Sequence, residues 1–178
     1  MPHYCDTAPQ HEVHAVYHEQ EYGFPVAHDH ILFERLALEI NQAGLSWEIV
    51  LRKRAAIWES FRGFNPKIVA EFGTKELDSL LANPGIIRNR LKIESIIHNA
   101  GVISNLAQAF GSFSGWLSAQ HPLPVEEWTI LFKKTFKFTG KEITREFLMS
   151  TGYLQGAHRE DCPVFRRIVA LKPPWLEA

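Results

Sequence analysis

Hydrophobic positions recur along this chain with the spacing of helices, and the pattern predicts an almost entirely helical protein. In the clearest case, Leu32, Leu36 and Ala43 fall on one face of a helix expected from about Asp29 to Ala43. No stretch of useful length alternates apolar and polar residues as a half-buried strand does. The sequence therefore predicts an all-α fold.

Capping residues and breaks at glycine, proline and asparagine divide the rest of the chain into further helices. Long ones are expected at about 46–62, 88–110, 126–136 and 141–151, and shorter ones after Pro66, after a cap at Thr74 and after Pro163. The Gly-, Ser- and Pro-rich stretch 111–124 is expected to be a connection. Without repeats or low-complexity segments, residues 1–178 are expected to form a single domain.

Composition narrows the class of protein without selecting a function. Hydrophobic residues make up 46% and charged residues 22%, as in a globule with a real core, and the formal net charge is -1. Any nucleic-acid binding must therefore come from a local basic patch. No apolar run approaches the ~18 residues of a membrane span. The first residues have no signal-peptide pattern, so a cytoplasmic protein is expected.

The two cysteines stand near opposite ends of the chain, and each has a histidine at a suggestive distance. His18 follows Cys5 by thirteen residues, and His158 precedes Cys162 by four. Two thiolates and two imidazoles are the ligand set of a closed tetrahedral zinc site. The alternative is two unrelated buried thiols and surface histidines. A zinc ion here would join residues 5–18 to residues 158–162, and it would be structural because no coordination position is open.

The first long helix and the turn after it contain two features that could carry chemistry. Glu39 lies on the apolar stripe, where a carboxylate is costly unless it is paired. It is either satisfied by an arginine or a backbone group, or it lies at the floor of a pocket and accepts hydrogen bonds from a ligand. In the turn 42–47, Leu45 and Trp47 are either ordinary core residues or a wedge beside a stacking aromatic ring.

The segment 80–92 has the outline of a helix–hairpin–helix, in which a turn at Asn83-Pro84-Gly85 separates a helix end from a basic helix start. The backbone N–H groups of such a turn, with the following helix N-terminus, can hold a phosphate without reading sequence. The basic residues Arg88, Arg90 and Lys92 would supply countercharge. The alternative is a simple helical hairpin with a solvated basic face.

Together these motifs resemble the DNA-3-methyladenine glycosylase I family, from Cys5 to Cys162. The matching segments are Tyr17-His18 with Glu21 and Gly23, Leu38-Glu39, Gln42-Ala43-Gly44-Leu45-Ser46-Trp47, Gly85-Ile86-Ile87-Arg88 with Lys92-Ile93, and Phe136-Lys137-Phe138 before Gly140. The resemblance implies a two-lobed helix–hairpin–helix fold, with the hairpin at about residues 75–110. It also implies one structural zinc ion per chain, held by Cys5, His18, His158 and Cys162.

The activity that the resemblance implies is base-excision repair. A monomeric enzyme would flip N3-methyladenine out of double-stranded DNA and hydrolyse its N-glycosidic bond. Glu39 and Tyr17 would hydrogen-bond the base in catalytic roles, and Trp47 would stack on it. The residues expected to contact DNA are Gly44, Leu45, Gly85, Ile86, Arg88, Arg90 and Lys92, with Leu45 filling the gap in the duplex. Because N3 methylation makes the base cationic and a good leaving group, a modest electrostatic site suffices.

The chain departs from the family pattern at three positions that shape the base pocket. Thr7 replaces a tryptophan, His14 replaces an aromatic residue that is often tyrosine, and Tyr22 replaces a tryptophan. Losing two aromatic rings would widen the pocket, and each lost stack would cost ~1–3 kcal/mol. Two alternatives therefore stay open. One is a divergent member that binds damaged DNA without excision, and the other is an enzyme that excises a different alkylated base.

Overall fold

The computed structural model describes residues 3–177, and every regular element in that part of the chain is helical. The α-helices are α1 (Tyr4–Thr7), α2 (His14–Gln20), α3 (Asp29–Gln42), α4 (Trp47–Ser60), α5 (Pro66–Val69), α6 (Thr74–Ala82), α7 (Arg90–Phe110), α8 (Phe113–Gln120), α9 (Val125–Thr135), α10 (Lys141–Ser150) and α11 (Pro163–Ala170). Single 3₁₀ turns lie at Ala8–Gln10, Arg62–Phe64 and Pro174–Glu177. The expected all-α class is confirmed. None of the described helices has the length and apolar character needed to cross a membrane.

Side-chain caps set the helix starts. Ser46 caps α4 as predicted, and its hydroxyl accepts the N–H of Ile49 at 3.3 Å. Helix α7 starts two residues later than expected, at Arg90, because Asn89 is its cap. The Asn89 side chain accepts the N–H of Lys92 at 3.1 Å.

Two predictions about helix limits were wrong. The stretch 111–124 contains α8, which the sequence pattern missed because its glycine and serine content is typical of a connection. Ser112 caps this helix by accepting the N–H of Gly115 at 2.7 Å. Thr74 is the first residue of α6 rather than its cap. Gly73 precedes it, and the Glu76 carboxylate accepts the Gly73 N–H at 2.9 Å.

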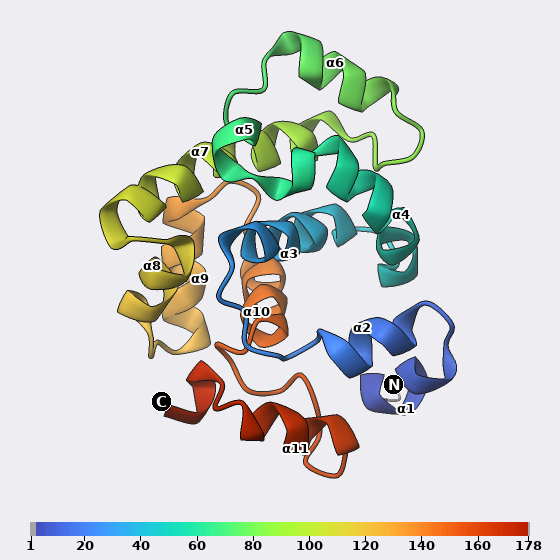
Figure 1. Cartoon of the computed structure of the whole chain (residues 1–178), viewed down its shortest axis with the longest axis vertical. Helices are drawn as coiled ribbons and strands as arrows, with labels where there is room; N and C mark the ends of the chain where they lie inside the picture. The colour runs from blue at the N-terminus through green and yellow to red at the C-terminus, as the bar shows by residue number, and fades with distance from the viewer. Residues whose placement is uncertain (1–2, 178) are drawn as a thin grey trace.

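Helix α3 lies at the centre of the molecule, between α4–α7 on one side and α8–α10 on the other (Figure 1). It packs against α4, α7, α8 and α10, and its residues 32–41 are all buried. Four of these residues are polar: Glu34, Arg35, Glu39 and Asn41. Buried polar groups need partners. The partners of these four side chains therefore show which of them the fold satisfies and which is left to bind a ligand.

The two ends of the described chain meet on one side, where α1 and α2 lie beside α11 (Figure 1). Arg159 holds both carboxylate oxygens of Asp6, at 2.9 and 2.6 Å, and Arg167 donates to the carbonyl of Glu19 at 2.9 Å. Exposed ion pairs of this kind stabilise a fold only slightly. Apolar packing of Val164 and Ile168 with Cys5 and Phe24 also joins the two ends.

Candidate functional site

Three of the four buried polar side chains of α3 have partners within the protein. Asn41 donates to a carbonyl of its own helix at 2.9 Å. Arg54 donates to both carboxylate oxygens of Glu34, at 2.7 and 2.8 Å. Arg35 donates to Glu21 at 2.6 Å. These three side chains therefore have structural roles in the fold.

Glu39 is the exception. Its side chain is 6% exposed, yet its carboxyl forms no hydrogen bond or ion pair with any residue of the described range 3–177. It faces a cavity of about 310 Å³, which is within the size range of small-molecule sites. The lining consists of Tyr4, Tyr17, Tyr22, Glu39, Gln42, Trp47 and Glu146. The alternative that Glu39 is satisfied by an arginine or a backbone group therefore fails.

Aromatic rings from several segments wall this cavity. Tyr17 of α2 and Trp47 of α4 meet edge to face, with ring centroids 5.1 Å apart. Tyr4 of α1 meets Tyr22 in the same way at 5.4 Å, and Tyr22 lies 5.7 Å from Tyr17. Aromatic faces favour flat guests and attract positive charge. The arrangement suits a planar, cationic ring.

Arg35 orients the hydroxyl of Tyr17. Its guanidinium lies over the Tyr17 ring, 5.0 Å from the centroid, and donates to the hydroxyl oxygen at 3.3 Å. Because that oxygen accepts from Arg35, its own proton is free for a guest in the cavity. Burial raises the pKa of Tyr17, so the hydroxyl keeps this proton.

Burial and a neighbouring carboxyl group oppose the ionisation of Glu39. Burial, followed by the nearby carboxyl of Glu146, raises the pKa of Glu39 to about 8, while the charge of Arg35 acts in the opposite direction. Burial likewise raises the pKa of Glu146. Glu39 is therefore mostly protonated at neutral pH when the cavity holds no cation, and a cationic guest would favour its ionised form.

The sequence reasoning gave no site role to three residues of the lining, Tyr4, Gln42 and Glu146, although Gln42 belongs to one of the matching segments. Tyr4 directly precedes Cys5, so any cluster that fixed Cys5 would also have placed Tyr4. Glu146 lies on the inner face of α10, three residues after Ile143 and four before the buried Ser150. An acid on an apolar face is the signal that identified Glu39, and it was available here too.

Thr7 and His14, two expected pocket positions, do not line the cavity. Thr7 is exposed, and its hydroxyl donates to the carbonyl of Tyr4 at 3.5 Å. His14 Nδ1 lies 2.9 Å from the hydroxyl of Tyr4, within hydrogen-bonding distance. The aromatic ring in this part of the cavity comes instead from Tyr4, with His14 as its hydrogen-bond partner.

Two hydrogen bonds between Gln42 and Leu45 close the turn between α3 and α4. The Leu45 N–H donates to the carbonyl of Gln42 at 2.8 Å, and the Gln42 side chain donates to the carbonyl of Leu45 at 3.1 Å. Gly44 sits between them with a φ of 78°, a conformation that favours glycine. Since Gln42 and Trp47 both line the cavity, the turn holds the half-buried Leu45 next to it.

Lys92 belongs to this turn rather than to a basic surface, which corrects the expected DNA-contacting role. It is buried, and its Nζ donates to the carbonyls of Asn41 and Ala43, at 2.8 and 2.6 Å. Burial also lowers the pKa of Lys92. Lys92 therefore ties α7 to the end of α3 and is not available to a phosphate.

A tight turn joins α6 to α7. The Asn83 side chain accepts the N–H of Gly85 at 2.8 Å, and the Asn83 carbonyl accepts that of Ile86 at 3.4 Å. Ile86 is buried, so its side chain fixes the turn instead of contacting a ligand. Arg88 and Arg90 are exposed around the start of α7.

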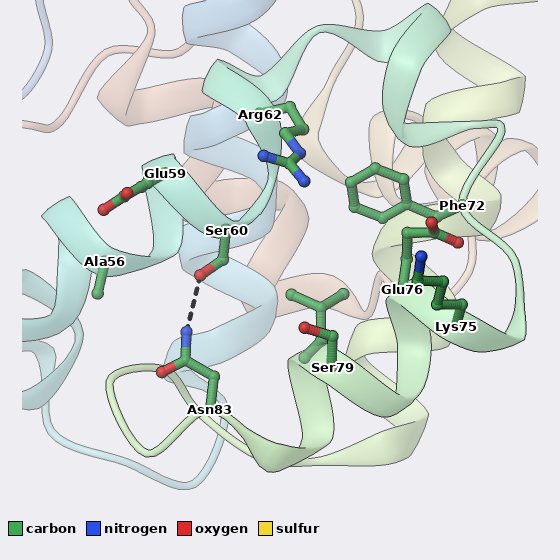
Figure 2. Close-up of a pocket in the computed structure, with 10 residues that line it drawn as sticks. Ala56, Glu59, Ser60, Arg62, Phe72, Lys75, Glu76, Ser79 and Asn83 are labelled. Carbon is green, nitrogen blue, oxygen red and sulfur yellow. Dashed lines mark hydrogen bonds between the residues drawn. The ribbon is translucent and has the colours of Figure 1, made fainter.

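A larger cavity, of about 520 Å³, opens between α4 and α6 (Figure 2). Arg62 and Lys75 line it together with acidic groups, and the side chain of Asn83 crosses one end to donate to Ser60 at 3.0 Å. Its charges are of both signs and no expected base-pocket residue reaches it. Glu39 and the aromatic cavity are the better candidate site.

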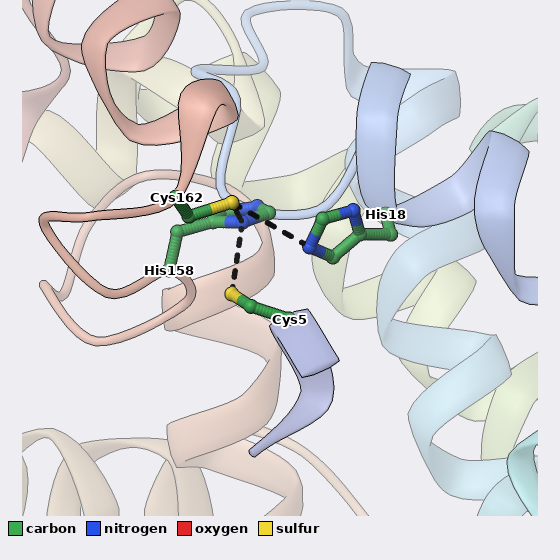
Figure 3. Close-up of side chains that lie close together, drawn as sticks. All are labelled: Cys5, His18, His158 and Cys162. Carbon is green, nitrogen blue, oxygen red and sulfur yellow. Dashed lines mark hydrogen bonds between the residues drawn. The ribbon is translucent and has the colours of Figure 1, made fainter. Parts of the chain in front are cut away.

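Cys5, His18, His158 and Cys162 converge in one cluster, as expected (Figure 3). Their ligand atoms all lie within 4.8 Å of one another. His158 Nδ1 is 3.5 Å from each sulfur, and His18 Nε2 is 3.9 Å from the sulfur of Cys162. Zinc bonds of ~2.3 Å to sulfur and ~2.0 Å to nitrogen, at tetrahedral angles, place sulfur and nitrogen about 3.6 Å apart. The cluster has the size of a metal site.

The protonation of the histidines also suits a metal. His158 Nε2 lies 2.7 Å from the carbonyl of Tyr22, which only an N–H can donate to, so the Nδ1 lone pair faces the two sulfurs. Burial lowers the pKa of His158 to about 4 and also lowers that of His18, and metal ligation requires the neutral ring. Both cysteines are free thiols. These four residues can therefore hold a metal ion.

A second group of possible ligands, His11, His14 and Glu48, is a poorer metal site. All three are only half-buried. His11 Nδ1 accepts the N–H of Val13 at 3.2 Å, so the proton of the neutral ring is on Nε2. Nε2 is the atom that faces Glu48, at 3.7 Å. This contact is an ordinary polar pair.

Comparison with known sequences points to the same family as the sequence motifs. The model of the methyladenine glycosylase family matches residues 7–127. The DNA-3-methyladenine glycosylase of Haemophilus influenzae is 31% identical in an alignment that covers 89% of this chain and 96% of that protein. DNA-3-methyladenine glycosylase 1 of Escherichia coli is 32% identical, with 83% and 89% covered.

Solved structures agree with the sequence comparison. 3-Methyladenine DNA glycosylase I from Staphylococcus aureus superposes with a TM-score of 0.78 at 32% identity, covering 87% of this chain and 92% of that one. A tyrosine-to-phenylalanine variant of 3-methyladenine DNA glycosylase I, in complex with 3-methyladenine, gives a TM-score of 0.81 at 31% identity, with 90% and 96% covered.

Proposed function

This chain belongs to the methyladenine glycosylase family, and from this premise we propose that it is a DNA repair enzyme that excises N3-methyladenine. The observation that carries the proposal is Glu39, a buried acid without a protein partner in the described structure, which faces an aromatic cavity. A flat, cationic base is the guest that such a cavity favours. We infer a hydrolase, because water is the acceptor of the sugar in this reaction class.

In the proposed reaction, the methylated nucleotide leaves the duplex and its base enters the cavity. Trp47 stacks on the ring, the Glu39 carboxylate accepts from the exocyclic amine, and the Tyr17 hydroxyl donates to a ring nitrogen. The glycosidic bond then breaks, and its electron pair leaves with the base, which becomes neutral. Water adds to the sugar carbon and loses a proton. Glu39 acts by holding the charged base in the cavity, and the positive charge that develops on the sugar needs only electrostatic help.

We propose that DNA binds across the turn 42–47 and the α6–α7 hairpin, and that residues 1–178 form one domain of two-lobed helix–hairpin–helix architecture. Gly44 gives the first turn its sharp bend, and Leu45 would enter the gap left by the flipped base. In the hairpin, Gly85 lets the backbone approach a phosphate, and Arg88 supplies countercharge. Arg90 is a weaker contributor, because it already pairs with a glutamate at 3.3 Å.

Replacing Arg88 with alanine tests the hairpin assignment. We expect binding to duplex DNA to weaken by about tenfold at low salt, and the slope of log affinity against log salt to fall by about 1, because one phosphate contact is lost. The exposed Arg166→Ala variant on α11 has the same change of charge and should behave as wild type. Equal slopes for the two variants would remove Arg88 from the DNA interface.

We propose zinc as the metal of the Cys5, His18, His158 and Cys162 cluster, one ion per chain. Two thiolates and two imidazoles are a donor set that zinc favours, and with four protein ligands the ion would be structural. We also propose, as the family resemblance implies, a monomeric enzyme that acts on double-stranded DNA, and we place it in the cytoplasm, where thiols stay reduced.

The ring of Tyr4 is expected to contribute to the affinity of the base pocket. Tyr4→Ala should weaken the binding of free 3-methyladenine by about tenfold, because one aromatic face is worth ~1–3 kcal/mol. Tyr4→Phe keeps the ring and loses only the hydrogen bond to His14, so its affinity should stay within about twofold of wild type. Calorimetric titration of the free base measures both. Equal weakening in both variants would show that the hydroxyl matters and the ring does not.

The proposed activity is tested by incubating the protein with methylated genomic DNA and separating the released bases by chromatography. Release of free 3-methyladenine is expected. Release of a different base instead would make this a family member with another alkylated substrate. Binding to methylated DNA with no released base would support a protein that recognises damage without excising it.

A further inference from the structure

Glu146 gives the cavity a second carboxyl group. It is carried by α10, whereas Glu39 is carried by α3, and both line the same space. Residue 146 lies outside the segment that matches the family model, so the comparison assigns it no role. A second acid in a largely apolar cavity is costly unless it serves a guest.

The surroundings of Glu146 do not neutralise it. Its one side-chain hydrogen bond among the described residues comes from the hydroxyl of Tyr22, at 3.1 Å. It forms no ion pair within residues 3–177. Arg35, whose charge acts on Glu39, is already committed to Glu21 at 2.6 Å. The bond from Tyr22 instead holds the Glu146 carboxylate against the aromatic wall.

We propose that Glu146 is a specificity-determining residue, which together with Glu39 makes this pocket select bases that carry a formal positive charge. The inference rests on the proposed function and refines it, because it concerns which guests the same pocket accepts. Two carboxyl groups that face one small cavity repel each other when both are ionised. A cation between them removes that repulsion, and a neutral base of the same shape does not.

The effect of Glu146 on the ionisation of Glu39 supports this assignment. The carboxyl of Glu146 acts to raise the pKa of Glu39, after the larger effect of burial. Burial is the largest effect on Glu146 and raises its pKa, whereas the hydrogen bond from Tyr22 and the charge of Arg145 lower it and the charge of Glu142 raises it. Binding of a cation is therefore expected to release a proton from the pair, which binding of a neutral base does not.

Two small ligands of similar shape but different charge test whether the pocket selects its guest by charge. 3,9-Dimethyladeninium is a permanent cation in which a methyl group stands in for the sugar, and 9-methyladenine is its neutral counterpart. Calorimetric titration in two buffers of different ionisation enthalpy gives the dissociation constant and the number of protons released for each ligand. The variants are Glu146→Gln and the matched control Glu142→Gln, which removes an exposed carboxylate from the same helix.

Wild-type protein and Glu142→Gln should prefer the cation over the neutral base and release a proton when the cation binds. Glu146→Gln should lower this preference by about tenfold or more and reduce the number of protons released, because only Glu39 is left to ionise. Glu146→Ala repeats the test if the glutamine variant does not fold. A preference for the cation within twofold of wild type in the Glu146 variants would overturn the inference. Chromatography of released bases tests the proposed function separately, so the two ideas can fail independently.

Discussion

Replacement of Glu39 with glutamine is expected to reduce 3-methyladenine excision by about 100-fold, the loss typical of removing one well-placed electrostatic group from an active site. Glutamine keeps the shape of the side chain and can still accept a hydrogen bond. It cannot carry the negative charge that favours a cationic base. Because the base is already cationic before the bond breaks, the loss should appear as a smaller fraction of flipped base held in the pocket, and so as slower release, with little change in the affinity for undamaged DNA.

The same substitution should stabilise the folded protein at alkaline pH. The pKa of Glu39 is raised from 4.5 to about 8 by burial and by Glu146. A group with a raised pKa in the folded state stabilises the fold below its unfolded pKa, and this contribution is lost as pH rises through the folded value. Wild type should therefore lose stability relative to Glu39→Gln between pH 4.5 and 8, by an amount on the order of a few kcal/mol.

Thermal unfolding at pH 5, 7 and 8.5 measures this effect. We expect the melting temperature of Glu39→Gln to exceed that of wild type by about 5 °C or more at pH 8.5, and the gap to shrink toward pH 5. Glu71→Gln, which removes an exposed glutamate, should follow wild type at every pH. Parallel profiles for wild type and Glu39→Gln would mean that Glu39 is ionised in the folded protein, contrary to the geometry of the cavity.

Loss of the metal is expected to cause the largest loss of stability. Cys162→Ser should lower the melting temperature by about 10 °C or more, because a structural zinc site contributes several kcal/mol and joins segments far apart in the sequence. The base pocket should weaken as well. Tyr4 is adjacent to Cys5, and the Tyr22 carbonyl accepts from His158 at 2.7 Å, so two pocket rings are anchored at the cluster.

Elemental analysis and chelation check this prediction. The purified protein should contain about one zinc ion per chain, and a strong chelator should lower the melting temperature of wild type to that of Cys162→Ser. The chelator should have no further effect on the variant. Metal-free wild-type protein with an unchanged melting temperature would show that the cluster is two thiols and two imidazoles packed without an ion.

The sequence predicted the all-helical class, the convergence of the metal cluster and the cavity at Glu39, because each rests on a local rule. Helical spacing gives the first, ligand chemistry gives the second, and the cost of a buried carboxylate gives the third. Ser46 as a cap follows from the same kind of reasoning. The helical class and the cavity need no knowledge of how distant segments pack, and for the metal cluster the ligand set itself predicts that the two ends of the chain meet.

The errors about the site came from contacts between segments that are distant in sequence. Lys92 looked like a solvated base on a helix start, and only the packing of α7 on α3 shows that its ammonium is used by backbone carbonyls. Tyr4 enters the pocket because the cluster at Cys5 brings α1 against α2. Thr7 and His14 were therefore poor guides to the width of the pocket, since another aromatic ring occupies that part of the cavity.

The central claim is that this protein removes 3-methyladenine with Glu39 as the group that stabilises the cationic base. The most direct test is the single-turnover rate of 3-methyladenine release from methylated duplex DNA by wild type and by Glu39→Gln, in samples of equal zinc content. The account predicts release by wild type and a rate about 100-fold lower for the variant. Equal rates, or no release by folded wild type, would contradict it.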